Sequence, residues 1–106
     1  MNAAFVKSYK CLDNIFRKGA FSGIELNETL LDSAEKDRPL ITKIVYGVLD
    51  KNILLEYEIK IYASKVKPAV MPIIKIGLYA LRYLSIPQFA VINECVELTK
   101  SIGKKE

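Results

Sequence analysis

Asn93 and Glu94 place an amide and a carboxylate side by side in the otherwise apolar stretch IPQFAVINECVEL, residues 86–98. A carboxylate there could act as a general acid or base, but it would need a titratable partner in a cleft, and the sequence offers none. On a helix with its apolar positions facing the core, Asn93 points away and Glu94 lies at the edge of the apolar face. A half-buried carboxylate needs a partner. We therefore expect Glu94 to join helices, through Arg38, through Arg82, or through a backbone N–H at a helix start.

The other residue types that commonly do chemistry are absent or isolated. The chain has no histidine, which removes the usual general base and the commonest zinc ligand. Cys11 and Cys95 form no C-x-x-C motif, and each lies on an apolar helical stripe, so both are expected to be small buried hydrophobic residues. The five glycines form neither a dinucleotide-binding nor a Walker pattern. The sequence therefore predicts no catalytic residue and no metal site.

Composition predicts one small globular domain. The 106 residues are 51% hydrophobic and 26% charged, which is enough apolar surface for a single core. The net charge of +4 is compatible with a polyanionic partner but does not require one. No apolar run approaches the ~18 residues that a membrane span needs, and the N-terminus lacks the order of a signal peptide. We therefore expect a soluble cytoplasmic protein.

Helical periodicity runs through almost the whole chain. Apolar residues recur at i, i+4, i+7 and i+11 in residues 5–16 and again in residues 91–102, and a glycine follows each segment. Further helices are expected within residues 25–36, 40–49, 51–66 and 73–84. In the segment 51–66, the spacing places Leu54, Tyr57 and Ile61 on one apolar face. The alternation YEIKIY would also suit a strand, but its length and the flanking helices favour a helix. The predicted fold is a compact all-α bundle of five or six helices.

Several residues are expected to begin or end these helices. Asp37 is a suitable N-cap, and Pro39 fits the first turn that follows it, where a missing N–H costs nothing. Pro68 is expected to end the helix of residues 51–66. Ser85 is expected to cap the last helix, with Pro87 just inside it. Loops are therefore predicted to be short, as in compact bundles.

Three segments together carry a recognisable pattern: DRPLITKIVYGVLD (37–50), IIKIGLYALRYLSIP (73–87) and AVINECVELTK (90–100). They resemble the signature of the NusB-like all-helical domain. They are more similar still to the version at the N-terminus of the RsmB (Sun/Fmu) family of small-subunit rRNA cytosine-C5 methyltransferases. The matching positions are Asp37, Arg38, Tyr46, Gly47, Val48, Leu49, Ile76, Gly77, Tyr79, Leu81, Pro87, Ala90, Asn93, Glu94 and Val96.

Most of this pattern has a structural explanation. Gly47 and Gly77 lie in the middle of helices, where a glycine costs ~1 kcal/mol relative to alanine. Close approach of two helices is the expected reason. Tyr46 and Tyr79 are expected to bury their rings and keep a hydroxyl hydrogen bond. The resemblance therefore predicts a fold more directly than it predicts a site.

The sequence departs from the family at both ends. The family's first helix usually opens with an arginine near the position of Phe5, and the family continues with a further helix beyond the position of Glu106. We expect residues 1–106 to be a NusB-like domain that is the N-terminal fragment of a longer chain. Without the further helix, an apolar groove should be exposed, on which a homodimer could form.

The resemblance implies an RNA-binding accessory domain that helps to position rRNA and is not itself catalytic. S-adenosylmethionine would belong to a separate catalytic domain, and the partners would be rRNA, that catalytic domain or a ribosomal protein. Phosphate contacts would come from basic side chains. The candidates are Lys7, Lys10, Arg17, Lys18, Lys43, Lys75, Arg82 and Lys100.

Three other functions are compatible with the same residues. The first is a NusB-type transcription antitermination factor that binds a leader RNA and a ribosomal protein. The second is a protein–protein interaction module with no role in RNA binding. The third, a small independent enzyme, lacks a candidate site.

Overall fold

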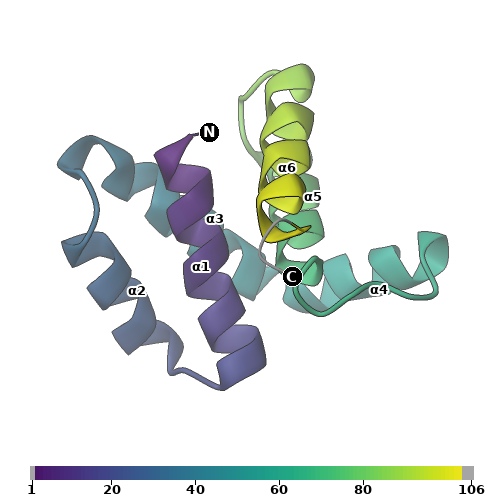
Figure 1. The fold of residues 1–106 in the computed structure, drawn as a ribbon, viewed down its shortest axis with the longest axis horizontal. Helices are drawn as coiled ribbons and strands as arrows, with labels where there is room; N and C mark the ends of the chain where they lie inside the picture. Colours follow the sequence, from purple (N-terminus) through teal and green to yellow (C-terminus); the bar gives the residue numbers. More distant parts are fainter. Residues whose placement is uncertain (1, 104–106) are drawn as a thin grey trace.

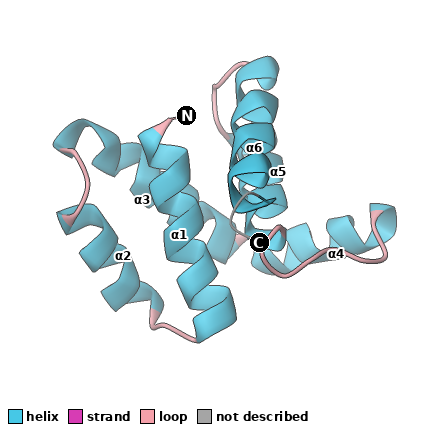
Figure 2. Cartoon of the chain, viewed as in Figure 1, coloured by secondary structure: helices cyan, strands magenta, loops and turns pink. Residues whose placement is uncertain are grey.

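The computed structural model describes residues 2–103, which form an all-α bundle with no strand in that range (Figure 1; Figure 2). The helical fold predicted from the sequence is confirmed, and the segment YEIKIY lies in a helix. No helix of residues 2–103 is long and apolar enough to cross a membrane. The elements are α1 (Ala3–Lys18), α2 (Ser22–Leu31), the 3-10 helix η1 (Glu35–Asp37), α3 (Arg38–Asp50), α4 (Asn52–Tyr62), α5 (Met71–Tyr83) and α6 (Gln88–Gly103).

Helix α1 forms the centre of one half of the bundle. The side chain of Asn2 accepts a hydrogen bond from the N–H of Ala4 at 2.8 Å, which caps the first turn. Phe5 and Leu12 are buried on its inner face. The helix ends at Gly19, whose φ of 70° lies in the left-handed region that glycine adopts without strain. The predicted end of this helix is confirmed.

The start of α3 differs in part from the prediction. Pro39 lies in its first turn as expected, but the side chain of Asp37 makes no capping hydrogen bond. The 3-10 helix η1 runs directly into α3, so the backbone of Asp37 (φ −90°, ψ −17°) is helical. A side-chain cap normally requires an extended N-cap residue, which explains why the predicted cap is wrong.

Two boundaries predicted from proline were also displaced. Helix α4 ends at Tyr62, because Ala63 adopts an extended conformation, so Pro68 lies in the following turn rather than at the helix end. Helix α6 begins at Gln88, and the carbonyl of Pro87 accepts the first N–H bonds of that helix, which leaves Ser85 in the loop. Proline disfavours the helical conformation of the residue before it, but it does not determine which earlier residue ends the helix.

Helix α4 buries the opposite face from the one its spacing suggested. The predicted stripe of Leu54, Tyr57 and Ile61 is exposed, whereas Leu55 and Ile59 are buried. The helix is apolar on both sides, so periodicity alone could not select its inner face. Figure 1 shows α4 projecting from the rest of the bundle. It packs against α3 and α5.

The contact between α3 and α5 joins the two halves of the bundle. Helix α5 also contacts α1, which is a second connection between the halves. Helix α3 packs further against α1, α2 and α4, and α5 packs against α4 and α6. A Cβ atom on Gly47 would overlap the buried ring of Tyr79, and one on Gly77 would lie 2.9 Å from the Sγ of Cys95. The close helix approach predicted for both glycines is therefore confirmed. Tyr46 is 55% exposed, so the prediction that its ring is buried is wrong.

Candidate nucleic-acid interface

The eight basic residues predicted to contact RNA do not gather in one place. Lys7 and Lys10 line a polar crevice between α1 and α2, while Lys100 lines an apolar groove between α5 and α6. Arg82 borders a third hollow, between α4 and α5. Arg17 and Lys18 are exposed at the end of α1, and Lys43 is exposed on α3. Which of these cations bind RNA stays a prediction.

Two of the cations on α1, Lys7 and Arg17, are matched by carboxylates. Lys7 Nζ lies 2.7 Å from Asp32 Oδ2 and 3.0 Å from the carbonyl oxygen of Asp32. This hydrogen bond lowers the pKa of Asp32 below its ordinary value. Arg17 donates to both carboxylate oxygens of Asp13, at 2.5 and 2.9 Å. We call this set, with Lys10, the paired-charge face: Lys7, Lys10, Asp13, Arg17 and Asp32.

The crevice next to this face is more acidic than basic. Its lining includes Glu25, Glu28 and Asp32 against Lys7 and Lys10. Three carboxylates against two ammonium groups leave no surplus of positive charge for a phosphate. Although this region holds several of the predicted candidates, it is therefore poorly suited to bind a polyanion.

Lys75 requires a correction, because it cannot serve as a surface contact. The residue is 2% exposed, and its Nζ lies 3.0 Å from Glu56 Oε1 and 4.0 Å from the centre of the Phe16 ring. Its ammonium thus links α5 to α4 and α1 through an ion pair and a cation–π contact. The same hydrogen bond lowers the pKa of Glu56. Helical spacing alone did not reveal that this lysine faces inwards.

Glu94 connects α6 to the start of α1. Its Oε1 accepts a hydrogen bond from the backbone N–H of Asn2 at 2.8 Å, which is one of the three partners expected from the sequence. Arg38 instead donates to the carbonyl of Leu30, and Arg82 pairs with Glu58. Asn93 is exposed, as predicted. The amide of Asn93 interrupts the apolar stretch because it lies on the outer face of α6. The carboxylate of Glu94 does so because it binds a backbone N–H at the start of α1.

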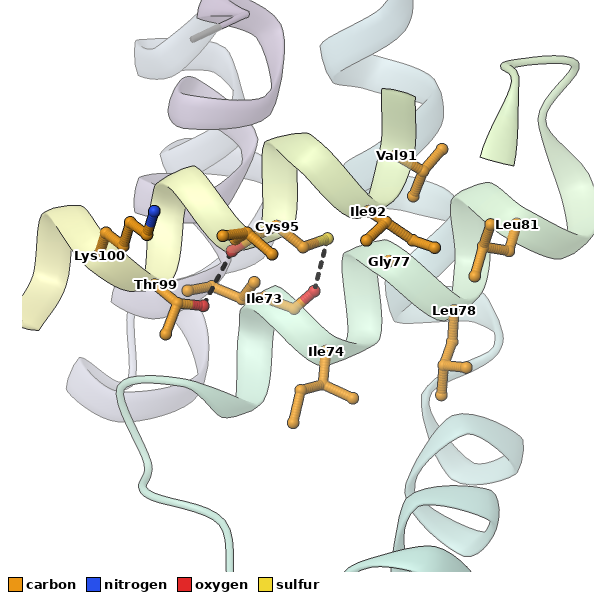
Figure 3. A pocket seen from close by; sticks show the side chains of 11 residues that line it. Ile73, Ile74, Gly77, Leu78, Leu81, Val91, Ile92, Cys95, Thr99 and Lys100 are labelled. Atoms are coloured by element: carbon orange, nitrogen blue, oxygen red, sulfur yellow. Dashed lines mark hydrogen bonds between the residues drawn. The ribbon is translucent and has the colours of Figure 1, made fainter. Parts of the chain in front are cut away.

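An apolar groove of about 460 Å³ runs between α5 and α6, where Figure 3 shows its lining side chains. Leu81, Ile92 and Val96 are partly exposed along it. Cys95 contributes its thiol, 3.8 Å from the carbonyl of Ile73, and burial raises the pKa of that thiol. Both cysteines are free, Cys11 is buried and Cys95 is half-buried. An apolar groove was expected from the sequence; its occupation by a second copy of the chain stays a prediction.

A different group of residues, not among the predicted candidates, combines cations with exposed aromatic rings. It lies on the outer half of α4 and the loop that follows, and we call it the tyrosine–lysine surface: Tyr57, Lys60, Ile61, Tyr62, Lys65 and Lys67. All six are exposed. Within residues 2–103, no carboxylate forms an ion pair with these three lysines.

A signal for this surface was present in the sequence. Residues 59–93 contain no aspartate and no glutamate, although they contain five lysine or arginine residues. A run of this length without acid indicates a region of positive potential. The individual lysines gave no such indication, because each one taken alone is typical of a solvated surface.

Sequence comparison identifies the class of this helical domain: the chain belongs to the NusB family, whose model matches residues 5–106. It is 36% identical over 92 residues to the "Probable ribosomal RNA small subunit methyltransferase B" of Bacillus subtilis (strain 168), covering 81% of this chain and 21% of that protein. It is 30% identical over 105 residues to the protein of the same name from Synechocystis sp. (strain ATCC 27184 / PCC 6803 / Kazusa), covering 92% and 24%. The chain thus spans about a quarter or less of the length of these relatives.

Proposed function

We propose that this chain is an RNA-binding domain that helps to hold small-subunit rRNA for methylation at a cytosine C5 by a separate catalytic domain. Membership of the NusB family, with relatives named as small-subunit rRNA methyltransferases, is the observation that carries the proposal. Binding to ribosomal RNA would locate the protein in the cytoplasm.

The distribution of charge supports RNA as the partner. Phosphate groups are bound by exposed cations that are not already neutralised by carboxylates. Lys60, Lys65 and Lys67, within the stretch of residues 59–93 that lacks acidic side chains, are such cations, whereas Lys7 and Arg17 of the paired-charge face are held by carboxylates. Among the eight candidates from the sequence, Lys75 is withdrawn and Arg82 is exposed but paired with Glu58, while Lys10, Lys18, Lys43 and Lys100 are exposed and form no ion pair among residues 2–103.

We infer that S-adenosylmethionine, the methyl donor of such enzymes, would bind to the separate catalytic domain rather than to residues 2–103. The apolar groove between α5 and α6 is lined by no carboxylate that could hold the ribose hydroxyls. The described helices also provide no glycine-rich turn after a strand, which nucleotide-type ligands commonly use. The residues present do not fit the cofactor, so no step of methyl transfer is assigned to this chain.

Binding measured as a function of salt tests the proposal. The purified chain is titrated against a fluorescently labelled transcript of small-subunit rRNA, and the dissociation constant is determined from about 50 to 200 mM KCl. If a few phosphates are neutralised, log K should fall linearly with log salt, with a slope of roughly −0.7 per contact on single strands. Dextran sulfate serves as the competing polyanion.

Two results would contradict the proposal. One is the absence of measurable binding to the transcript at low salt. The other is competition by dextran sulfate as effective as competition by the unlabelled transcript, because any basic protein would show that behaviour. Preferential binding to rRNA with a steep salt dependence is the expected result.

A further inference from the structure

The tyrosine–lysine surface exposes aromatic rings that do little for folding. Tyr62 is 85% exposed and Tyr57 is 69% exposed, whereas the contact of α4 with the core depends on the buried Leu55 and Ile59. Exposed rings of this size contribute little hydrophobic stabilisation, because most of their area stays in water. Tyr57 and Tyr62 are five residues apart on α4, so they point roughly 140° apart around the helix and together cover its outer end rather than a single face. Exposure of large apolar side chains there indicates a contact surface.

Lysines surround these rings. Lys60 follows Tyr57 by three residues, which places it on the adjacent turn of the same helix face, and Lys65 and Lys67 follow Tyr62 in the loop. None of the three is paired with a carboxylate of residues 2–103, and the nearest acid before them in the chain is Glu58. Glu58 is itself bound to Arg82, and Glu56, one turn before Lys60, is hydrogen-bonded to Lys75 and interacts only electrostatically with Lys60. The positive charge of the three lysines is therefore available to an anionic partner.

A hollow of about 310 Å³ lies next to one of the rings. Its walls include Tyr62 and the Arg82–Glu58 pair, while Ile74 and Leu78 of α5 provide an apolar floor. A flat group with apolar faces and a polar edge would match these surroundings, because its faces could lie on the ring while its edge meets the charged pair. An unpaired nucleobase has this chemistry.

We propose that the tyrosine–lysine surface binds single-stranded RNA, with a base on Tyr62 in this hollow, a second base on Tyr57, and phosphates along Lys60, Lys65 and Lys67. This inference rests on the proposed RNA-binding function and specifies its site and the form of RNA that the site takes. Base-paired RNA keeps its bases stacked inside a helix, so it offers phosphates to the lysines but no free base face to the tyrosines.

The test compares a labelled single-stranded RNA 12-mer with its fully paired duplex, using fluorescence anisotropy. The variant Tyr57→Ser/Tyr62→Ser removes both rings, and Tyr46→Ser on α3 removes a ring that is exposed elsewhere. Because the two substituted rings are largely exposed, the variant should remain folded, which circular dichroism and the thermal midpoint verify. A third variant, Lys60→Gln/Lys65→Gln/Lys67→Gln, removes the charges.

The wild type should bind the single strand more tightly than the duplex. The double tyrosine variant should lose at least about 10-fold in affinity for the single strand, with little change in salt dependence. The triple lysine variant should lose affinity and reduce the salt slope by about 2. Tyr46→Ser should leave both unchanged. Since the chain has no tryptophan, quenching of tyrosine fluorescence on binding gives a second readout of stacking.

Three outcomes would overturn the inference. Unchanged single-strand affinity in both the tyrosine and lysine variants would exclude this surface while leaving the proposed RNA-binding function intact. Equal affinity for strand and duplex would exclude base stacking. Loss of self-association in the tyrosine variant, with no effect on RNA binding, would identify the surface as a contact between copies. Failure of the wild type to bind any RNA would instead contradict the proposed function itself.

Discussion

The paired-charge face and the tyrosine–lysine surface contain similar numbers of cations but differ in what surrounds them. On the first, Lys7 and Arg17 hold carboxylates within 2.9 Å. On the second, no carboxylate of residues 2–103 pairs with any of the three lysines, and two tyrosine rings lie exposed beside them. Counting basic residues does not distinguish the two regions, whereas their partners do.

This difference separates two uses of surface charge. Ion pairs such as Lys7–Asp32 connect neighbouring elements and contribute little net charge, so they serve the fold. Unpaired lysines next to exposed aromatic rings carry a cost in repulsion and exposed apolar area, and a binding partner would offset that cost. The comparison therefore supports the proposal that α4 and its following loop serve recognition, while the ion pairs of α1 and α2 serve the fold.

The largest effect is expected at the contact that joins the two halves carrying these regions. In Gly47→Ala, the new methyl group overlaps the buried ring of Tyr79. Displacing that ring should lower the free energy of unfolding by about 2–4 kcal/mol, measured by urea denaturation. Gly23→Ala is the matched control, because a Cβ there meets nothing within 4 Å. A loss below about 0.5 kcal/mol in Gly47→Ala would show that Tyr79 moves aside easily.

Charge reversal tests the comparison between the two regions directly. Lys60→Glu/Lys65→Glu/Lys67→Glu should weaken binding to single-stranded RNA by roughly 100-fold or more, because it replaces three unpaired cations by anions. Lys7→Glu/Lys10→Glu/Arg17→Glu makes the same change in net charge on the paired-charge face and should weaken binding by less than about 5-fold. Equal losses measured by anisotropy would show that only net charge matters and would remove the distinction.

The helical fold was predictable from the sequence because the spacing of apolar residues along the chain follows the period of a helix. Apolar spacing, the glycine after α1 and the mid-helix glycines all concern local geometry or close packing, and the structure confirms them at Gly19, Gly47 and Gly77. Predictions that depended on how the helices pack against one another were less successful. Both faces of α4 are apolar, and only its docking on α3 and α5 decides that Leu55 and Ile59 are buried.

The candidate site was predicted less well for a related reason. The sequence does not show whether a given lysine contacts a carboxylate or an aromatic ring on another element. Lys7 contacts Asp32, and Lys75 contacts Glu56 and Phe16. The partner of Glu94 was likewise one of several possibilities until the start of α1 was placed beside it. The long stretch without acidic residues was the one regional signal that did not depend on such contacts.

Lys75 provides a third test, since it is a cation that the structure removes from the RNA surface. Lys75→Ala should lower the free energy of unfolding by about 2 kcal/mol, because it leaves a cavity beside Phe16 and removes the partner of Glu56. Lys75→Met retains most of the volume and should cost less than about 1 kcal/mol. Neither should change RNA affinity by more than about 2-fold, since the ammonium does not reach solvent.

The Lys75 variants should also change how the free energy of unfolding depends on pH. Because Lys75 lowers the pKa of Glu56, the stabilisation is present above the carboxyl's ordinary pKa and is lost as pH falls through the lowered folded value. Urea denaturation between about pH 3 and 6 should therefore show a smaller loss of stability on acidification in Lys75→Met than in the wild type. An identical acid dependence would mean that the ion pair contributes nothing.

The smallest effect is expected when a paired lysine is released. Asp32→Asn removes the carboxylate that holds Lys7, so the paired-charge face gains one free cation. Affinity for single-stranded RNA should rise by no more than about 3-fold, because one added cation without aromatic neighbours contributes a single phosphate contact. Glu28→Gln is the control, since it removes a charge from the same crevice without releasing a bound lysine.

Acid cannot replace this substitution. Lys7 lowers the pKa of Asp32 below its ordinary value, so protonating this carboxylate needs a lower pH than usual, and the ion pair is intact at neutral pH. A rise of 10-fold or more in Asp32→Asn, measured by anisotropy at neutral pH, would make α1 the principal RNA surface and its ion pairs a restraint on binding. A rise confined to a few-fold would instead mean that free charge alone is insufficient and that the exposed tyrosines beside the α4 lysines supply what α1 lacks.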